Sequence, residues 1–235
     1  MINKQLVVAL DVANKNELLK VLDFLPNNIS WYKVGLELFI SEGPEILNIL
    51  KKLNKSIFLD LKLHDIPQTV ENALMVACDY DVDMMTVHGL GGKAMLESAA
   101  NIASRSKSPP KLVAVTTLTS LANKDLSDIG VSRNISDQAI ALGSLAISSG
   151  IDGLVTSAFE AKALRDKFPT SLLVTPGIRL QNDCVNDQKR VASPDFALSQ
   201  GATHLVVGRS ILKSNNPSSV VDKILEYIKQ DKLNG

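Results

Sequence analysis

Two carboxylates and an ammonium group stand close together in the segment FLDLKLHDIPQTV, which covers residues 58–70. Asp60, Lys62 and Asp65 fall within six residues, directly after an apolar run that is typical of a buried strand. Charges inside a protein are costly unless they are paired. Clusters of paired acids and lysines are typical of functional sites, although a purely structural ion-pair network is the alternative. The segment therefore favours catalysis by fixed charges.

The elements that must position these charges alternate between short apolar runs and longer amphipathic stretches. Nearly continuous apolar strands separated by helices are typical of a parallel sheet that is covered on its faces. Helical spacing of apolar residues predicts helices between the strands, for example over residues 15–25, 69–80 and 216–230. The predicted strands cover residues 5–10, 30–35, 56–61, 82–88, 111–117, 151–157, 171–176 and 203–208.

This pattern predicts an α/β fold, a single-domain (β/α)8 TIM barrel over residues 1–235. No linker rich in glycine, serine or proline divides the chain. A doubly wound open sheet is the alternative. The GxGxxG fingerprint of dinucleotide-binding sheets does not follow the first predicted strand, which disfavours that alternative.

Polar side chains gather at the carboxyl ends of the predicted strands, where barrels of this kind carry their active sites. Side chains alternate faces along a strand, so Asp60 and Lys62 should point inward together with Phe58. Lys33 lies on the neighbouring strand, and Asp65 follows just beyond the third strand, so the four charges can form an alternating, formally neutral array. The other polar strand ends are Asp11, His88, Ser157 and Gly208–Arg209, and the seventh strand ends in Pro176–Gly177.

The last predicted strand ends in VVGRSI, a sequence that suits phosphate binding. The loops after the seventh and eighth strands form the common phosphate site of these barrels. Gly208 allows backbone N–H groups to approach a ligand closely, and Arg209 can hold two phosphate oxygens with its planar guanidinium group. A turn with a solvated arginine is the alternative.

Two long polar segments follow strands and could cover a ligand. Residues 175–194 could form a lid that closes on substrate through Arg179 or Gln188, and a surface loop is the alternative. Residues 118–136 form the second segment, in which Thr119 or Ser120 could offer a hydroxyl group to a ligand.

Composition excludes several classes of function. Lys+Arg and Asp+Glu both number 25 and aromatic residues make up 4%, which argues against binding nucleic acid. The two cysteines and three histidines show no disulfide or metal-ligand spacing. No apolar run reaches the roughly 18 residues of a membrane span, and the N-terminus does not resemble a signal peptide. We therefore expect a cytoplasmic protein that binds no membrane.

The segment FLDLKLHDIPQTV resembles the DxKxxD signature of the orotidine 5′-phosphate decarboxylases, including the Ile-Pro and Thr that follow it. The string is highly specific. No departure is seen at the catalytic positions. Further segments resemble the bacterial form of the family in the same order: VALDVA, YKVGLELF, VHGLGG, VTTLTS, TPGIR, DQKR and VVGRSI.

The resemblance implies decarboxylation of orotidine 5′-phosphate to UMP and CO2, the last step of pyrimidine nucleotide synthesis, with no metal and no organic cofactor. It also implies a homodimer in which Asp65 and Thr69 reach into the neighbouring subunit's site. Lys62 would be the proton donor. The implied catalytic residues are Lys33, Asp60, Lys62 and Asp65. The implied substrate contacts are Asp11, Lys33 and Thr69 to ribose, Thr119 to the pyrimidine, and Arg179, Gln188, Gly208 and Arg209 to phosphate.

Two rival functions remain open on the sequence. The Mg2+-dependent sugar-phosphate decarboxylases and synthases of the same superfamily resemble this chain in their barrel, their DxK pair and their phosphate end. They use an acidic residue near the second strand, where this chain has Lys33, and this disfavours a metal. A non-catalytic barrel that binds nucleotide phosphates is the other rival. Such a barrel would need no lysine beside two acids.

Overall fold

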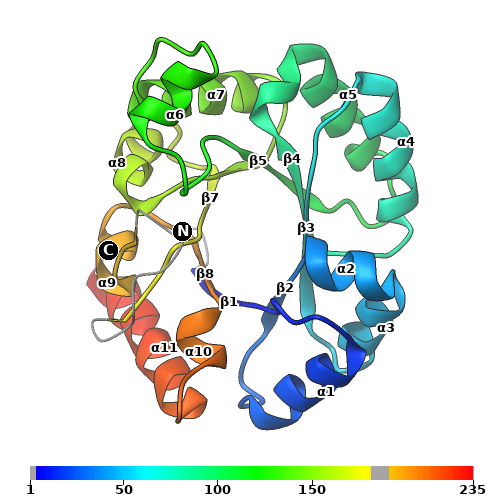
Figure 1. Ribbon diagram of the computed structural model, residues 1–235, viewed down its shortest axis with the longest axis vertical. Helices are drawn as coiled ribbons and strands as arrows, with labels where there is room; N and C mark the ends of the chain where they lie inside the picture. Colours follow the sequence, from blue (N-terminus) through cyan, green and yellow to red (C-terminus); the bar gives the residue numbers. More distant parts are fainter. Residues whose placement is uncertain (1–3, 181–190, 235) are drawn as a thin grey trace.

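The structure, a computed structural model, describes residues 4–180 and 191–234. Eight parallel strands form a closed barrel in sequence order, and the helices surround it (Figure 1). β1 also pairs with β8 in parallel, from Gln5 opposite His204 to Val8 opposite Val207. The predicted (β/α)8 barrel is therefore confirmed, and the open sheet is excluded.

The predicted strands all form, and most end within one or two residues of the predicted limits. The strands are β1 (Gln5–Ala9), β2 (Trp31–Gly35), β3 (Ser56–Leu63), β4 (Met84–His88), β5 (Lys111–Val115), β6 (Gly153–Val155), β7 (Leu172–Thr175) and β8 (His204–Val207). The helices are α1 (Lys15–Phe24), α2 (Leu36–Glu42), α3 (Glu45–Lys52), α4 (Pro67–Cys78), α5 (Gly92–Ser104), α6 (Asn123–Asp128), α7 (Ile135–Ser148), α8 (Ala158–Lys167), α9 (Pro194–Ser199), α10 (Arg209–Leu212) and α11 (Pro217–Asn234), with a 3-10 turn η1 (Gly89–Gly91). None of these described helices is both long and apolar enough to span a membrane.

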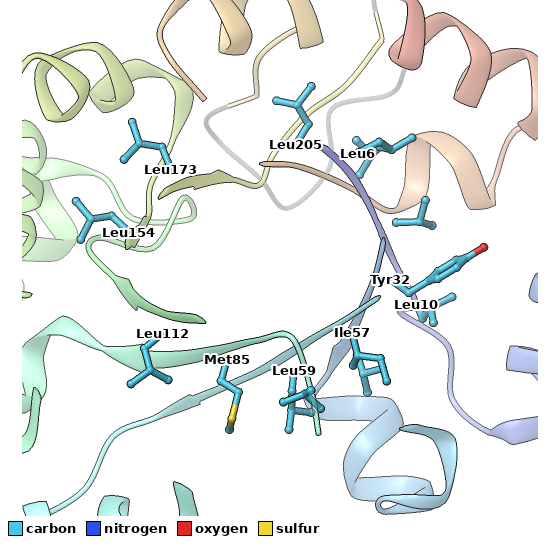
Figure 2. Close-up of a cluster of buried hydrophobic side chains, with 14 of the residues drawn as sticks. Leu6, Leu10, Tyr32, Ile57, Leu59, Met85, Leu112, Leu154, Leu173 and Leu205 are labelled. Carbon is cyan, nitrogen blue, oxygen red and sulfur yellow. The ribbon is translucent and has the colours of Figure 1, made fainter. Parts of the chain in front are cut away.

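The strands bury apolar side chains on both faces, as a covered parallel sheet requires. On β3, Ile57 and Leu59 belong to the large outer cluster between strands and helices, and Phe58 belongs to the inner cluster. Figure 2 shows the outer side chains pointing away from the barrel interior. The inner cluster consists of Val7, Ala9, Phe58, Met84, Val113, Val174 and Val206, and it fills the interior below the carboxyl ends of the strands.

β3 departs from a regular strand where its charges lie. The sequence predicts that it ends at residue 61, but it continues to Leu63. Its pairing with β4 shifts between Leu59 and Leu63, so that three residues of β3 lie opposite a single residue of β4, Thr86. Lys62 has a φ of 51° in this bulge, a left-handed conformation that is uncommon for a residue with a side chain. Bulges of this kind re-aim side chains next to active sites.

Carboxylates at the amino ends of the strands bind the backbone. Asp152 accepts a hydrogen bond from the Leu112 N–H at 2.9 Å and one from Lys111 Nζ at 2.7 Å. Asp83 accepts one from the Ile57 N–H at 2.8 Å. The Asp83 and Asp152 side chains accept hydrogen bonds from backbone N–H groups at the start of the sheet. Their role is therefore structural.

His204 is buried at the same end of the barrel. Its Nδ1 lies 2.9 Å from the Thr203 hydroxyl, and its ring meets Trp31 edge-on with the ring centroids 5.5 Å apart. Burial lowers the pKa of His204 to about 4. His204 begins β8, so it lies at the opposite end of the barrel from the carboxyl ends of the strands.

Candidate active site

A cavity of about 230 Å³ lies at the carboxyl ends of the strands. Its floor includes Ala9, Phe58, Val174 and Val206 of the inner cluster. Apolar walls around a few polar groups are typical of small-molecule sites. Predicted site residues that line it are Asp11, Lys33, Asp60, Lys62, Thr119, Arg179, Gly208 and Arg209.

The charged side chains of this cavity form one continuous series. Lys62 Nζ lies 2.9 Å from Asp60 Oδ1, and Lys33 Nζ lies 3.7 Å from Asp60 Oδ2. Lys33 Nζ also donates to Asp11 Oδ1 at 3.0 Å. The side chains of Asp60 and Lys33 are only 13% and 10% exposed, whereas that of Lys62 is 34% exposed. Asp60 is therefore held between two ammonium groups, and the Lys62 ammonium is the more accessible of the two.

Two glycines leave room for this series. A Cβ atom at Gly35 would lie 2.9 Å from Lys33 Nζ, closer than such atoms approach in proteins. A Cβ atom at Gly208 would lie 3.3 Å from Asp11 Oδ2. Glycine at these two positions allows the backbone to come close to the charges.

Thr86 connects the two charged residues of β3. Its hydroxyl accepts a hydrogen bond from the Lys62 N–H at 2.7 Å and donates to Asp60 Oδ1 at 3.1 Å. Thr86 is completely buried. The sequence does not indicate this role, because a threonine in the apolar run MMTVH is also an ordinary strand residue. The available signal is a polar side chain on the inward face of the strand next to the DxK pair.

Two arginines stand at the end of the cavity formed by β7 and β8. Arg209 begins α10 directly after Gly208, and Arg179 follows the turn at Gly177. The Arg179 N–H donates to the Ala192 carbonyl at 2.9 Å, which joins the two sides of the predicted lid segment. A phosphate dianion suits such a pair of guanidinium groups. Gln188, the other predicted lid residue, lies outside the described residues.

Asp65 and Thr69 do not line the cavity of their own chain. Both are exposed, and Asp65 Oδ1 accepts a hydrogen bond from the N–H of Ile66 at 2.7 Å. The reason is that β3 ends at Leu63 and Pro67 starts α4, which carries this segment away from the cavity. Within this chain the charge series runs from Lys62 through Asp60 and Lys33 to Asp11 and does not include Asp65. The catalytic role of Asp65 stays a prediction.

Two other polar strand ends have structural partners. The His88 ring stacks on that of His64, with centroids 5.0 Å apart and an interplanar angle of 17°. Burial, followed by the charges of His64 and Lys62, lowers the pKa of His88 to about 4. The hydroxyl of Ser157 donates to Glu160 at 2.8 Å, and its oxygen caps α8 by accepting a hydrogen bond from the Phe159 N–H at 3.2 Å. Neither side chain lines the cavity.

Metal ligands are not assembled in the part of the chain that the structure describes: no three His, Cys, Asp or Glu side chains there are grouped to hold an ion. The position between Asp11 and Asp60 is taken by the Lys33 ammonium.

The fold and the cavity define a class of protein: a (β/α)8 barrel whose cavity combines a set of fixed charges with two arginines suited to a phosphorylated ligand. Residues 4–224 match the model of the Orotidine 5′-phosphate decarboxylase / HUMPS family. The chain belongs to this family.

Relatives in this family match nearly the whole chain. An orotidine 5′-phosphate decarboxylase of Gloeothece citriformis is 42% identical and covers 97% of this chain and 99% of its own length. One of Bacillus pumilus is 44% identical over 94% of this chain and 97% of its own length. The crystal structure of orotidine 5′-phosphate decarboxylase from Lactobacillus acidophilus is similar with a TM-score of 0.85 and 34% identity, covering 96% and 99% of the two chains.

Proposed function

We infer that this chain is a carboxy-lyase that converts orotidine 5′-phosphate to UMP and CO2, the final step of de novo pyrimidine nucleotide synthesis. The observation that carries this inference is the position of Asp60 between Lys33 and Lys62 in a cavity that ends in two arginines. Relatives named as orotidine 5′-phosphate decarboxylases match at 40–44% identity over nearly the whole chain, which supports it.

The proposed orientation of the substrate follows the distribution of polar groups in the cavity. Arg179 and Arg209 bind the phosphate, and Gln188 and the backbone at Gly208 contribute to the same end. Asp11 and Lys33 bind ribose hydroxyls, and Thr119 contacts the pyrimidine. Binding energy from a phosphate that is remote from the reacting carbon can then contribute to the chemical step.

The proposed reaction breaks the bond between C6 and the carboxylate. The electron pair stays on C6 and CO2 leaves. The Lys62 ammonium stabilises the developing negative charge and donates a proton to C6, after which water returns a proton to the lysine. Asp60 faces the substrate carboxylate, and Lys33 keeps Asp60 in place. Fixed charges of this kind often contribute more to catalysis than any other effect, because they need no reorganisation during the reaction.

A metal-dependent sugar-phosphate reaction fits this cavity less well. Lys33 lies within 3.0 Å of Asp11 and 3.7 Å of Asp60, so its ammonium group already balances the carboxylates that would otherwise attract a cation. We therefore propose a reaction that needs no metal ion and no organic cofactor.

The proposed assembly is a homodimer in the cytoplasm. Asp65 and Thr69 are exposed at the start of α4, and the neighbouring Ile66 exposes 66% of its surface. A single exposed isoleucine is ordinary on a protein surface, so the proposal of a dimer rests on the family resemblance. In this arrangement Asp65 completes the charge series of the partner's site, and Thr69 binds its ribose.

Hybrid dimers test this arrangement. Lys62→Ala and Asp65→Ala proteins are each expected to be nearly inactive as homodimers. After the two are mixed and allowed to exchange subunits, roughly a quarter of the sites combine an intact Lys62 with an intact Asp65 from the other chain, so about a quarter of the wild-type activity should return. If activity does not return although exchange is demonstrated, Asp65 does not act across subunits.

A direct assay tests the reaction itself. Purified protein treated with EDTA is mixed with orotidine 5′-phosphate, and the ultraviolet absorbance is followed as UMP forms. Rapid conversion supports the proposal. Conversion only after Mg2+ is added would instead support a metal-dependent relative, and tight UMP binding without turnover would support a non-catalytic binding barrel.

A further inference from the structure

The bulge in β3 leaves a backbone donor without the usual partner in a parallel ladder. Three residues of β3 lie opposite Thr86 alone, so the Lys62 N–H does not meet a β4 carbonyl in the regular register. The Thr86 hydroxyl accepts this N–H at 2.7 Å instead. A side-chain oxygen therefore takes the place of a backbone carbonyl at the residue that carries the proposed proton donor.

The Thr86 hydroxyl has a single proton, and it donates this proton in a hydrogen bond to Asp60. It donates to Asp60 Oδ1 at 3.1 Å, the oxygen that also accepts a hydrogen bond from Lys62 Nζ at 2.9 Å. The other oxygen, Oδ2, faces Lys33. Thr86 thus fixes which carboxylate oxygen faces each lysine, and it also holds the backbone from which Lys62 projects.

Thr86 acts through these two residues and not on the substrate. It is 0% exposed and does not line the cavity. Its neighbours on β4 show that it points into the barrel: Met84 belongs to the inner cluster, and Met85 and Val87 belong to the outer one. The hydroxyl therefore lies inside the barrel, beneath the charged groups.

We propose that Thr86 is a positioning residue of the decarboxylation site, whose hydroxyl keeps Asp60 and Lys62 in the reactive arrangement. This inference rests on the roles proposed above for Asp60 and Lys62. Because Lys62 has a φ of 51°, its backbone relies on surrounding contacts to remain in this conformation. Small displacements of catalytic groups are enough to slow a reaction strongly.

Thr86→Val tests the hydroxyl because valine has nearly the same shape. We expect kcat to fall about 10- to 100-fold, the scale of loss seen when reacting groups are displaced by about 1 Å, while KM changes by less than about threefold. Thr86→Ser retains the hydroxyl and should restore kcat to within about threefold of the wild type.

A matched control separates this effect from a general loss of stability. Thr203, at the amino ends of the strands, is 2% exposed, and its hydroxyl accepts a hydrogen bond from the Leu173 N–H at 2.9 Å and donates to the Leu173 carbonyl at 3.0 Å. Thr203→Val should lower the free energy of unfolding, measured in urea, and leave kcat nearly unchanged. Thr86→Val should remain folded by circular dichroism although it is slow.

Several outcomes would overturn the proposal. These are a wild-type kcat in Thr86→Val, or a Thr86→Ser protein that is as slow as Thr86→Val. If Thr86→Val does not fold, Thr86→Ala replaces it, and failure of both to fold would assign Thr86 to stability alone. A wild-type protein that does not turn over orotidine 5′-phosphate would instead contradict the proposed function. Turnover that is lost in Lys62→Ala but normal in Thr86→Val would contradict only the role of Thr86.

Discussion

The two ends of the barrel use the same types of charged residue in different ways. At the amino ends of the strands, the Asp152 carboxylate accepts hydrogen bonds from a backbone N–H and from Lys111. At the carboxyl ends, Asp60 pairs with Lys33 and Lys62. A charged side chain that hydrogen-bonds to the backbone stabilises the fold and has no further role in binding. Charges that bind mainly each other remain able to act on a substrate.

The largest expected difference between the two ends of the barrel is in kcat, and it is seen when one lysine is removed from each end. Lys62→Ala should lower kcat by at least about 10³-fold, because it removes both a proton donor and a fixed charge, while folding and UMP binding are retained. Lys111→Ala is the matched control. Its ion pair is largely exposed, so it should change the unfolding free energy by less than about 1 kcal/mol and leave kcat unchanged. A near-normal kcat in Lys62→Ala would contradict its role as proton donor.

The phosphate end should show the next largest effect. Arg209→Ala is expected to lower kcat/KM for orotidine 5′-phosphate roughly 100-fold, since truncating one partner of a charged hydrogen bond costs about 2–5 kcal/mol. The substrate without phosphate, orotidine, should react equally slowly with the variant and the wild type. An unchanged kcat/KM for the phosphorylated substrate would mean that Arg209 does not hold the phosphate.

A substitution at the amino ends should affect stability and not catalysis. Asp152→Ala removes the acceptor of the Leu112 N–H, and Leu112 is 1% exposed. We expect the free energy of unfolding in urea to fall by about 1–3 kcal/mol, the cost of leaving a buried donor unpaired, with a wild-type kcat below the unfolding transition. A marked fall in kcat in the folded variant would show that the two ends are coupled.

The smallest expected effect concerns pH. Burial lowers the pKa of His204 to about 4, whereas an unfolded histidine titrates near 6.5, so the unfolded state binds a proton first as the pH falls. Stability should therefore decrease below about pH 6.5, with His204 contributing about 1 kcal/mol between pH 7 and pH 5.5. His204→Gln should lose this part of the pH dependence in urea unfolding. An unchanged dependence would mean that His204 is not buried in its neutral form.

The sequence predicts the barrel and the place of Gly208–Arg209 after the last strand because both depend on local signals. Apolar strands alternating with amphipathic helices define the barrel, and Gly208–Arg209 follows directly on the last strand. The residues of such motifs are close in space because they are close along the chain.

The parts that the sequence does not predict depend on how two strands pair or where the chain turns. The bulge at Lys62 and the contact with Thr86 arise from the register between β3 and β4, and no glycine in β3 indicates it. Asp65 is close to Lys62 along the chain, but it does not line the cavity that Lys62 lines. A balance of acids and lysines at the strand ends therefore indicates that a charged cluster exists, but it does not show which residues belong to the cluster.

Closure of the barrel between β1 and β8 has a consequence for synthesis on the ribosome. β1 leads to Asp11 and β8 leads to Arg209, and the Lys4 and Asp231 side chains join the two ends of the chain. Until the last strand has emerged, the first strand lacks a neighbour on one side, and the cavity lacks its phosphate end. Substrate binding therefore requires that β8 has been made, because a nascent polypeptide that stops before β8 holds every residue of the DxK strand without a closed site around it.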